Sequence, residues 1–296
     1  MPDIPVWNKC DNRCVMCTNM RSFPKADSAQ YGLAWQVRKM ERYLRGLGRT
    51  YLKNDDNPHF INLTGGEPTL HPDFLKLIAY FRGRLPGVNI TLLSNGRRLA
   101  DREFREKFLR AARPPFAVGI PLHGPTAALH DLVAGVPGAF RQTVAALKGL
   151  MAAKNGPEVE IRFVLHRLNI GSFAATLRFM RRAFAGGKYR VTAIHYEIEG
   201  ESRTNHARLA LRLSDSAAAV NAAARLIRSF PDLRLYHFPL CLIAPELRER
   251  CWVTLPREDR VYPAACRGCR LRPGCLGLMK DYRRKFGDSE LKPVKK

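Results

Sequence analysis

Acidic residues are scarce in this 296-residue sequence, which carries 26 Asp and Glu against 50 Lys and Arg and a formal net charge of +24. It also lacks an apolar run of the roughly 18 residues that a membrane-spanning helix needs. Its beginning, MPDIPVWNKC, has no basic and then apolar secretory signal. No internal repeat or low-complexity segment is present. We therefore expect a cytoplasmic globular protein without membrane contacts, and the 46% hydrophobic residues suffice for a sizeable core.

Cysteine is absent from the whole middle of the chain. Three of the eight cysteines lie between Cys10 and Cys17 and five between Cys241 and Cys275. A reducing compartment argues against a disulfide framework. Scattered buried cysteines would act as small hydrophobic residues, whereas two groups at the two ends predict two metal sites.

The positive charge favours polyanions or acidic peptides as partners. Most arginines are dispersed over several predicted helices, and only the end, LKPVKK, is a charge run, which we expect to be frayed. Nucleic-acid binding is therefore the less favoured interpretation.

Strand-like and helix-like segments alternate along the chain, which predicts an α/β fold with parallel strands and helices outside. About six βα units form a partial (β/α)6 TIM-like barrel, followed by a cysteine-rich segment. Barrels of this kind carry their chemistry at the carboxyl ends of the strands. The predicted strands are 4–7, 59–68, 88–96, 116–124, 159–166, 190–200 and 233–238. The predicted helices are 30–47, 72–85 (with Asp73 near its start), 101–112, 138–153, 172–184 and 214–230 (with Ser214 as N-cap).

The first cysteine group, Cys10, Cys14 and Cys17, has the spacing C-x3-C-x2-C after the first strand. Three soft thiolates on one loop suit an iron–sulfur cluster or zinc, but structural zinc requires four ligands and no fourth is near. Three ligands on a four-iron cluster leave one iron open, where an amine and a carboxylate of a small molecule can bind.

This loop resembles that of the radical S-adenosylmethionine (SAM) superfamily. The resemblance covers about residues 4–200. It rests on the cysteine spacing, the apolar Met16, GGEPTL at the end of the next strand and LLSNG at the end of the strand after it. It implies that Cys10, Cys14 and Cys17 hold a [4Fe-4S] cluster that binds SAM.

The resemblance also implies SAM contacts at the next two strand ends. Gly65, Gly66 and Glu67 are expected to meet the methionyl amine, with the glycines allowing close backbone approach. Ser94 and Asn95 are expected to contact the ribose or the methionine. Alone, each motif would be an ordinary turn.

The chain departs from the family at Pro121, where many relatives place a serine that touches the nucleoside. We expect Arg162 on the next strand to point inward and compensate, although a surface arginine is the alternative. The implied chemistry is reductive cleavage of SAM to methionine and a 5′-deoxyadenosyl radical that abstracts hydrogen, with the cofactor supplying the reactivity.

In the second cysteine group, CRGCRLRPGC supplies Cys266, Cys269 and Cys275, and a four-thiolate site needs one more ligand. We favour Cys241, directly after a strand, over Cys251, which lies in an apparently helical segment.

Many relatives carry such a segment as a twitch or SPASM domain with an auxiliary [4Fe-4S] cluster, and zinc is the alternative metal. The full SPASM pattern needs a cysteine where Met279 stands, so we expect one auxiliary cluster. We divide the chain into a radical SAM partial barrel (1–230), a twitch/SPASM-like segment (231–285) and a basic tail (286–296).

Several segments across about residues 115–280 are similar to the radical maturase of the His-Xaa-Ser peptide system. This similarity implies a maturase of a ribosomally synthesised peptide (RiPP) that cross-links, epimerises or otherwise modifies it. The expected partners are the peptide, a reductase such as flavodoxin or ferredoxin and, since the chain is short before Cys10, a leader-binding or second maturase protein. The alternatives are a radical SAM enzyme that modifies tRNA or other RNA, and a noncatalytic metal-binding scaffold.

Other titratable residues carry weaker expectations, and the catalytic residues stay unassigned. His123, His130 and His166 are expected to be packed or hydrogen-bonded rather than catalytic. Glu197 and Glu199 alternate on a predicted strand. If they face inward they could meet a substrate amine or a peptide, and Tyr196 would then point away.

Overall fold

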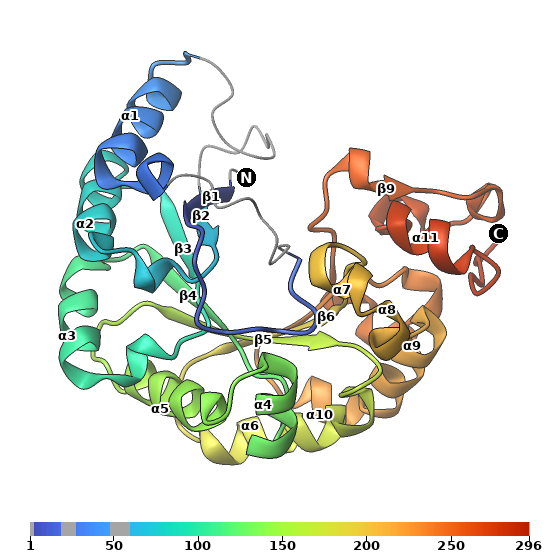
Figure 1. Cartoon of the computed structure of the whole chain (residues 1–296). Helices are drawn as coiled ribbons and strands as arrows, with labels where there is room; N and C mark the ends of the chain where they lie inside the picture. The colour runs from blue at the N-terminus through green and yellow to red at the C-terminus, as the bar shows by residue number, and fades with distance from the viewer. Residues whose placement is uncertain (1–2, 19–27, 48–59, 296) are drawn as a thin grey trace.

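The computed structural model describes residues 3–18, 28–47 and 60–295 and shows a curved, all-parallel sheet with helices on its convex side (Figure 1). The sheet has eight strands in chain order. They are β1 (Asp3–Trp7), β2 (Phe60–Gly65), β3 (Asn89–Leu93), β4 (Phe116–Pro121), β5 (Glu158–Leu165), β6 (Arg190–His195), β7 (Leu233–Tyr236) and β8 (Cys251–Trp252). The predicted partial barrel is thus confirmed, and His59, at the start of a predicted strand, lies outside the described residues.

The helices follow the strands in the order that a βα-barrel requires. The α-helices are α1 (Leu33–Leu44), α2 (Phe74–Arg84), α3 (Arg102–Ala111), α4 (Ala127–Ala134), α5 (Ala139–Met151), α6 (Phe173–Ala183), α7 (Gly200–Thr204), α8 (His206–Leu209), α9 (Leu213–Ala222), α10 (Ala224–Arg228) and α11 (Lys280–Phe286). The 3-10 turns are η1 (Ser28–Tyr31), η2 (Pro68–Leu70), η3 (Arg98–Ala100), η4 (Ile170–Ser172), η5 (Leu240–Leu242), η6 (Pro245–Arg250), η7 (Arg257–Asp259), η8 (Ala264–Cys266) and η9 (Arg272–Gly274).

The sheet has an apolar face toward the helices and a polar concave face. Phe163 of β5 stacks on Phe173 of α6, with ring centroids 5.9 Å apart, so every second residue of β5 faces the helix layer. The residues between them, Glu160 and Arg162, therefore line the concave side. The core lies between sheet and helices, which leaves the inside of the barrel for a ligand.

Five local predictions need correction. β8 extends the sheet beyond the seven predicted strands, and it contains Cys251, which we expected in a helix; only the preceding η6 is helical. The helix expected over 214–230 breaks at Ala223, and its first part is capped at Arg212 instead of Ser214. The predicted strand 190–200 ends at His195 because the next residues turn toward α7.

The carboxyl-terminal end is attached to the fold, so the expectation of a frayed tail is wrong for residues up to Val294. The backbone N–H of Arg270 donates to the Val294 carbonyl at 2.9 Å, and Glu290 accepts from Tyr282 and from the Ser214 backbone. Leu291 and Pro293 line the same small pocket as several cysteines.

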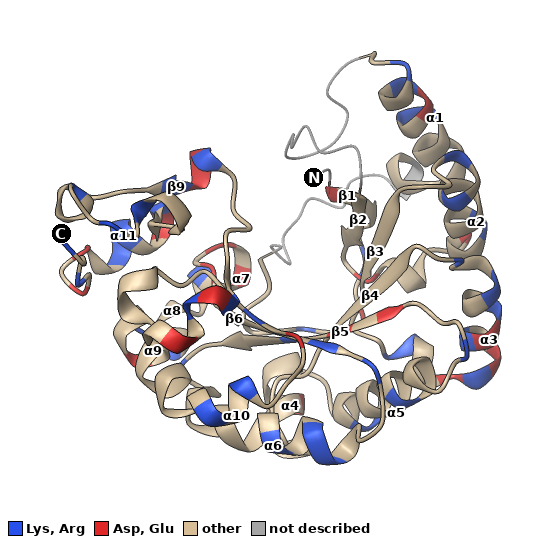
Figure 2. Cartoon of the chain, turned by 180° about the vertical axis from the view of Figure 1, so that it is seen from behind, with Lys and Arg blue, Asp and Glu red and all other residues tan. Residues whose placement is uncertain are grey.

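The segment after β8 forms a small layer beside the barrel. Its short strands β9 (Arg260–Val261) and β10 (Leu278–Met279) pair antiparallel and lead into α11 (Figure 1). Lysines and arginines are spread over the outer helices (Figure 2). Within the described ranges, no helix is long and apolar enough to cross a membrane.

Candidate functional site

The three-cysteine loop runs from the end of β1 across the top of the barrel, and two helices hold it there. The backbone N–H groups of Arg13 and Val15 donate to carbonyls at the end of α4, at 2.9 and 3.0 Å. On the other side, the first turn of α7 donates from the Glu201 N–H to the Cys17 carbonyl at 2.8 Å, and Asn205 donates to the Val15 carbonyl. The cysteines therefore lie at the carboxyl ends of the strands, as predicted.

The glycines of GGEP are required by the cluster loop itself. Gly65 has φ +127°, and a Cβ there would lie 2.1 Å from the Trp7 carbonyl oxygen; at Gly66 it would lie 2.3 Å from the Lys9 carbonyl oxygen. The N–H groups of Gly66 and Glu67 donate to those same two carbonyls, each at 2.7 Å. Only residues without a side chain allow this approach, so the turn after β2 fixes where the loop begins.

Glu67 is buried, and its carboxylate faces the end of β3. One oxygen accepts from Thr69 and from the Ser94 hydroxyl at 2.7 Å, and the other accepts from the Asn95 N–H at 2.7 Å. Burial raises the pKa of the Glu67 carboxyl, although these hydrogen bonds act in the opposite direction. Glu67, Ser94 and Asn95 are thus brought together, and Glu67 joins two strand ends.

Arg97 holds the cluster loop in place, a role that was not predicted from the sequence. Its guanidinium donates to the Asp11 carbonyl at 2.8 Å, to Asn12 Oδ1 at 3.1 Å and to Gln142 of α5 at 2.6 Å, and it pairs with the Asp11 carboxylate at 3.0 Å. Asn95 Nδ2 donates to the same carboxylate at 2.6 Å. The only signal in the sequence was that polar residues stand within the cysteine motif and directly after LLSNG.

The environment of the Cys10 and Cys14 thiols fits an iron–sulfur cluster. The Asn12 N–H points to Cys10 Sγ at 3.4 Å, and Asn12 Nδ2 lies 3.8 Å from Cys14 Sγ. Such donors accompany cluster thiolates. Burial, with smaller contributions from the neighbouring thiols, raises the pKa of Cys14 to about 12, and burial raises that of Cys10 to about 11. A bound cationic centre would replace these protons.

In the described parts of the chain, no three His, Cys, Asp or Glu side chains are arranged as the ligands of one ion. A cluster has several irons, so its thiolates need not converge on one point.

Arg162 lies on the concave face, beside Pro121 of the neighbouring strand. It pairs with Pro121 in the β4–β5 register, and its Nη1 donates to the buried carboxylate of Glu160 at 2.7 Å. A Cβ on Gly119 would lie 3.2 Å from the Arg162 side chain. The inward orientation is as expected, and the ion pair with Glu160 limits the rotamers that Arg162 adopts.

Four of the five carboxyl-terminal cysteines line one small pocket: Cys241, Cys266, Cys269 and Cys275. The N–H groups of Leu240 and Gly277 point to Cys275 Sγ at 3.3 and 3.4 Å.

Cys251 does not line that pocket. Its thiol lies 3.9 Å from the Leu247 carbonyl, and burial raises its pKa to about 12. This arrangement favours Cys241 over Cys251 as the fourth ligand of an auxiliary site.

His123, His130 and His166 gather under the ends of β4 and β5 and are buried. The His123 and His130 rings lie 5.1 Å apart, and His130 Nδ1 accepts from the His123 N–H. Burial lowers the pKa of His130 and of His166 to about 4. The three are therefore neutral at pH 7, as packed residues would be, and at most 1% of each is exposed.

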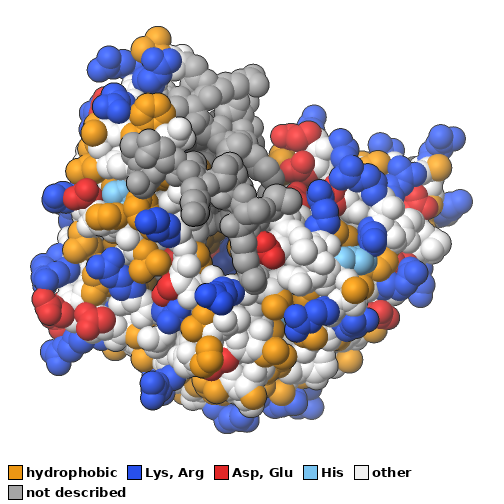
Figure 3. All heavy atoms as spheres, in the orientation of Figure 1, with side chains coloured by type: hydrophobic (Ala, Val, Ile, Leu, Met, Phe, Trp, Pro, Cys, Tyr) orange, Lys and Arg blue, Asp and Glu red, His pale blue; other side chains and the backbone are white. Residues whose placement is uncertain are grey.

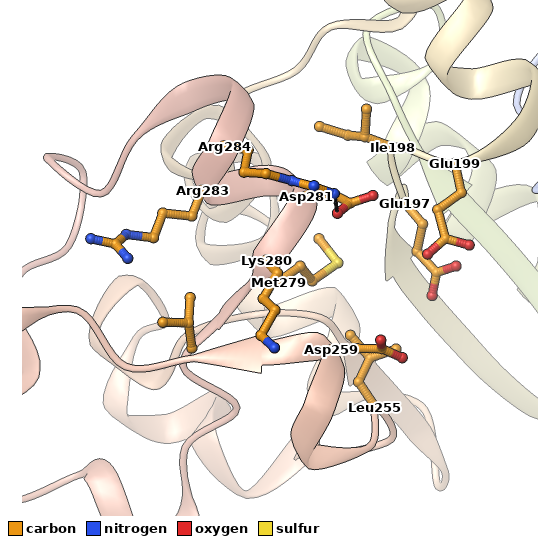
Figure 4. Close-up of a pocket in the computed structure, with 11 residues that line it drawn as sticks. Glu197, Ile198, Glu199, Leu255, Asp259, Met279, Lys280, Asp281, Arg283 and Arg284 are labelled. Carbon is orange, nitrogen blue, oxygen red and sulfur yellow. Dashed lines mark hydrogen bonds and ion pairs between the residues drawn. The ribbon is translucent and has the colours of Figure 1, made fainter. Parts of the chain in front are cut away.

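Glu197 and Glu199 border a pocket of about 460 Å³ between the end of β6 and the carboxyl-terminal segment (Figure 4). Glu197 lies 3.5 Å from His237 Nε2, and Glu199 is the residue before α7. Tyr196 is buried and does not line the pocket. The two carboxylates thus face a cavity, although they follow the strand rather than belonging to it.

An α/β partial barrel with three thiols on the loop after its first strand defines the class of this protein. The family model described as the radical SAM superfamily matches residues 4–180, more than half of the chain. The chain belongs to this superfamily.

The curated relatives support the same assignment. A mycofactocin maturase, MftC, of Mycobacterium ulcerans is 35% identical over 182 residues, covering 58% of this chain and 44% of that protein. An AdoMet-dependent heme synthase of Methanosarcina barkeri is 34% identical over 113 residues, covering 34% of this chain and 31% of that one. The chain thus spans less than half the length of these relatives.

Solved structures share the fold. SuiB of Streptococcus suis, bound to its precursor peptide SuiA, matches with a TM-score of 0.55 at 16% identity, covering 79% of this chain and 48% of that one. The structure titled anSMEcpe with bound AdoMet matches with a TM-score of 0.55 at 18% identity, covering 78% and 62%.

Proposed function

We propose that this chain is a radical SAM peptide maturase. The observation that carries the proposal is the three-thiol loop, clamped to the GGEP turn through two backbone hydrogen bonds, in a chain of the radical SAM superfamily. The peptide substrate rests on the 35% identity to a mycofactocin maturase and on the resemblance to the His-Xaa-Ser maturases.

Cys10, Cys14 and Cys17 would hold a [4Fe-4S] cluster and leave one iron to SAM. When bound, this pair supplies a 5′-deoxyadenosyl radical that abstracts hydrogen from an unactivated carbon. The contribution of the chain is to position both groups and to exclude water. Arg97 stiffens the loop by donating to Asn12 Oδ1, and Asn12 directs its own N–H donors at the sulfurs of Cys10 and Cys14.

The expected SAM contacts take different roles in this proposal. Gly65 and Gly66 would present backbone groups to the methionyl amine. Glu67 already accepts from Thr69, Ser94 and Asn95, which supports a part in orienting that turn and in adding negative charge near the ammonium. Arg162, on the concave face, is a candidate contact for the nucleoside.

We further propose that Cys241, Cys266, Cys269 and Cys275 hold one auxiliary [4Fe-4S] cluster. Their common pocket supports this. Four thiolates would leave no iron open, so the site would relay electrons or support the structure instead of binding substrate. Zinc on the same thiolates is the alternative, and iron and sulfide analysis of the anaerobic protein distinguishes the two.

The proposed maturase needs a one-electron reductant such as flavodoxin or ferredoxin, and it acts with a leader-binding or second maturase protein. Its basic surface favours an acidic leader. An RNA-modifying enzyme predicts tight tRNA binding with a steep salt dependence, and a noncatalytic scaffold predicts no SAM cleavage.

The test is anaerobic reconstitution with a candidate precursor peptide, namely a short peptide encoded beside this gene. The peptide should accelerate 5′-deoxyadenosine formation and change mass. A loss of about two daltons from the peptide would indicate a new bond. Epimerisation would leave the peptide mass unchanged in ordinary water and would add deuterium in deuterated water. A relative of heme synthases that ignores peptides would instead turn over a porphyrin, and this result would contradict the proposal.

A further inference from the structure

Basic residues adjoin the carboxyl-terminal cysteine pocket. Arg267 and Arg270 directly follow Cys266 and Cys269 in the chain, and both arginines are exposed. Arg272 is also exposed, and it lines the pocket itself. Three guanidinium groups are therefore carried by residues that bear, adjoin or closely follow the thiols of the pocket.

Two further contacts tie basic residues to particular thiols. The Arg272 guanidinium lies over the Tyr262 ring, 5.1 Å from its centroid. Burial raises the pKa of Cys266, and the charge of Arg272 acts in the opposite direction. The backbone N–H of Lys292 is hydrogen-bonded to Cys241, and Lys292 is exposed. The positive charge is thus built into the pocket and is not confined to the end of the chain.

The charge of these four basic side chains is not compensated. In the part of the chain that the structure describes, no ion pair joins any of them to a carboxylate. Asp288 pairs with Arg283 at 2.9 Å, and Glu290 pairs with Arg212 at 3.4 Å. Figure 3 shows basic side chains along the visible outline of the carboxyl-terminal segment. A surface of this kind attracts negatively charged partners.

The thiols distinguish this patch from the other basic surfaces of the chain. All four cysteines of the pocket are only half-buried, so a cluster that they hold would lie close to solvent. A carrier protein passes an electron to such a centre only over a short distance, and it must therefore dock beside it. An acidic peptide or an RNA would use the charge of the patch but would have no use for a redox centre. The combination favours an acidic electron carrier.

We propose that the patch formed by Arg267, Arg270, Arg272 and Lys292 is the docking site of an acidic one-electron carrier protein. The reduced cofactor of the carrier loses one electron, and the auxiliary cluster accepts it in passing from [4Fe-4S]²⁺ to [4Fe-4S]⁺. Complexes of this kind are small and transient, and charge steers their formation. The electron-transfer step rests on the auxiliary cluster of the proposed function, whereas docking is measured separately.

The first test measures docking as binding. The probe is an oxidised flavodoxin of net negative charge, and biolayer interferometry gives its Kd for the anaerobically reconstituted protein at low and at high salt. The patch variant is Arg267→Glu, Arg270→Glu. The matched control is Arg178→Glu, Arg182→Glu, which makes the same charge change at two exposed arginines of α6 or directly beside it. Iron and sulfide analysis shows whether each variant keeps its clusters, and the neutral pair Arg267→Gln, Arg270→Gln replaces a patch variant that loses iron.

At low salt, the patch variant should bind flavodoxin about tenfold more weakly or worse, and the control should change the Kd by about twofold at most. High salt should remove most of this difference. Unchanged binding to the patch variant, or equal weakening by the control, would overturn the docking site. So would a wild type that binds a polyglutamate peptide or tRNA through the patch and does not bind flavodoxin.

The second test compares two reductants in 5′-deoxyadenosine formation. With reduced flavodoxin, the patch variant should be slower than the wild type by a factor similar to its loss of binding. With dithionite, which needs no docking, the two proteins should react at the same rate. Equal slowing with both reductants would place the effect in the fold and overturn the proposal. A wild type that forms no 5′-deoxyadenosine with dithionite would contradict the proposed function instead, and the binding comparison would still decide the docking site.

Discussion

Replacing Arg97 should release the cluster loop without unfolding the barrel. In the Arg97→Ala variant, the loop loses the donors to the Asp11 carbonyl and to Asn12, and α5 loses the link through Gln142. Two well-formed charged hydrogen bonds contribute about 1.5–3 kcal/mol each, and the Asp11 ion pair, being partly exposed, adds at most about 1 kcal/mol.

The partners can relax and water can replace part of the lost hydrogen bonding. We therefore expect the free energy that is needed to open the loop to fall by about 2–4 kcal/mol. This corresponds to a population of open loop roughly 30- to 1,000-fold higher. Amide hydrogen exchange of residues 8–18 in the metal-free protein measures this directly, and iron retention against a chelator should fall in parallel.

Two variants provide controls. Arg97→Lys keeps the charge but lacks the planar fork, so it should recover only part of the protection. Arg98→Ala removes the neighbouring arginine, which donates to the Thr69 carbonyl and stacks on Phe104 without reaching the loop. Unchanged exchange in Arg97→Ala, or equal acceleration in Arg98→Ala, would refute the reasoning.

Three further predictions follow from the geometry. Gly66→Ala places a Cβ 2.3 Å from a backbone oxygen of the cluster loop, so urea unfolding should show a loss of about 1–3 kcal/mol; an unchanged midpoint would contradict the close approach. Cys241→Ser should remove about four irons per chain and Cys251→Ser none, and iron analysis giving the reverse would exchange their roles. His130 and His166 have pKa values of about 4 in the fold against an ordinary 6.5. The unfolded chain therefore binds more protons, and urea stability should fall as pH drops from about 6.5 toward 4; the same slope in a His130→Asn, His166→Asn double variant would contradict this.

The sheet could be predicted from the sequence because seven of its strands are short, mostly apolar runs that alternate with segments of helical periodicity. All seven expected strands exist, and they occur in the expected order. β8 was not predicted because it has two residues, Cys251 and Trp252, which is too few to show a periodic pattern. They form a strand only through their parallel pairing with β7. α4 was missed because it is short, and its start depends on the Thr126 cap.

The site was predictable where motifs are local and not where partners are distant. The cysteine spacing and GGEP identify the loop from the sequence. Arg97 and Asp11 are 86 positions apart, so only the fold brings them together. The pocket beside Glu197 is likewise completed by Asp259 and Met279, which follow Cys241 in the sequence and lie far from Glu197 along the chain.

SAM cleavage at the amino-terminal loop is the central step of the proposed function. Anaerobically reconstituted protein, reduced with dithionite in the presence of SAM, should yield 5′-deoxyadenosine and methionine, and a Cys14→Ala variant should yield neither. Wild-type protein that carries iron at this loop and still forms no 5′-deoxyadenosine would contradict the account.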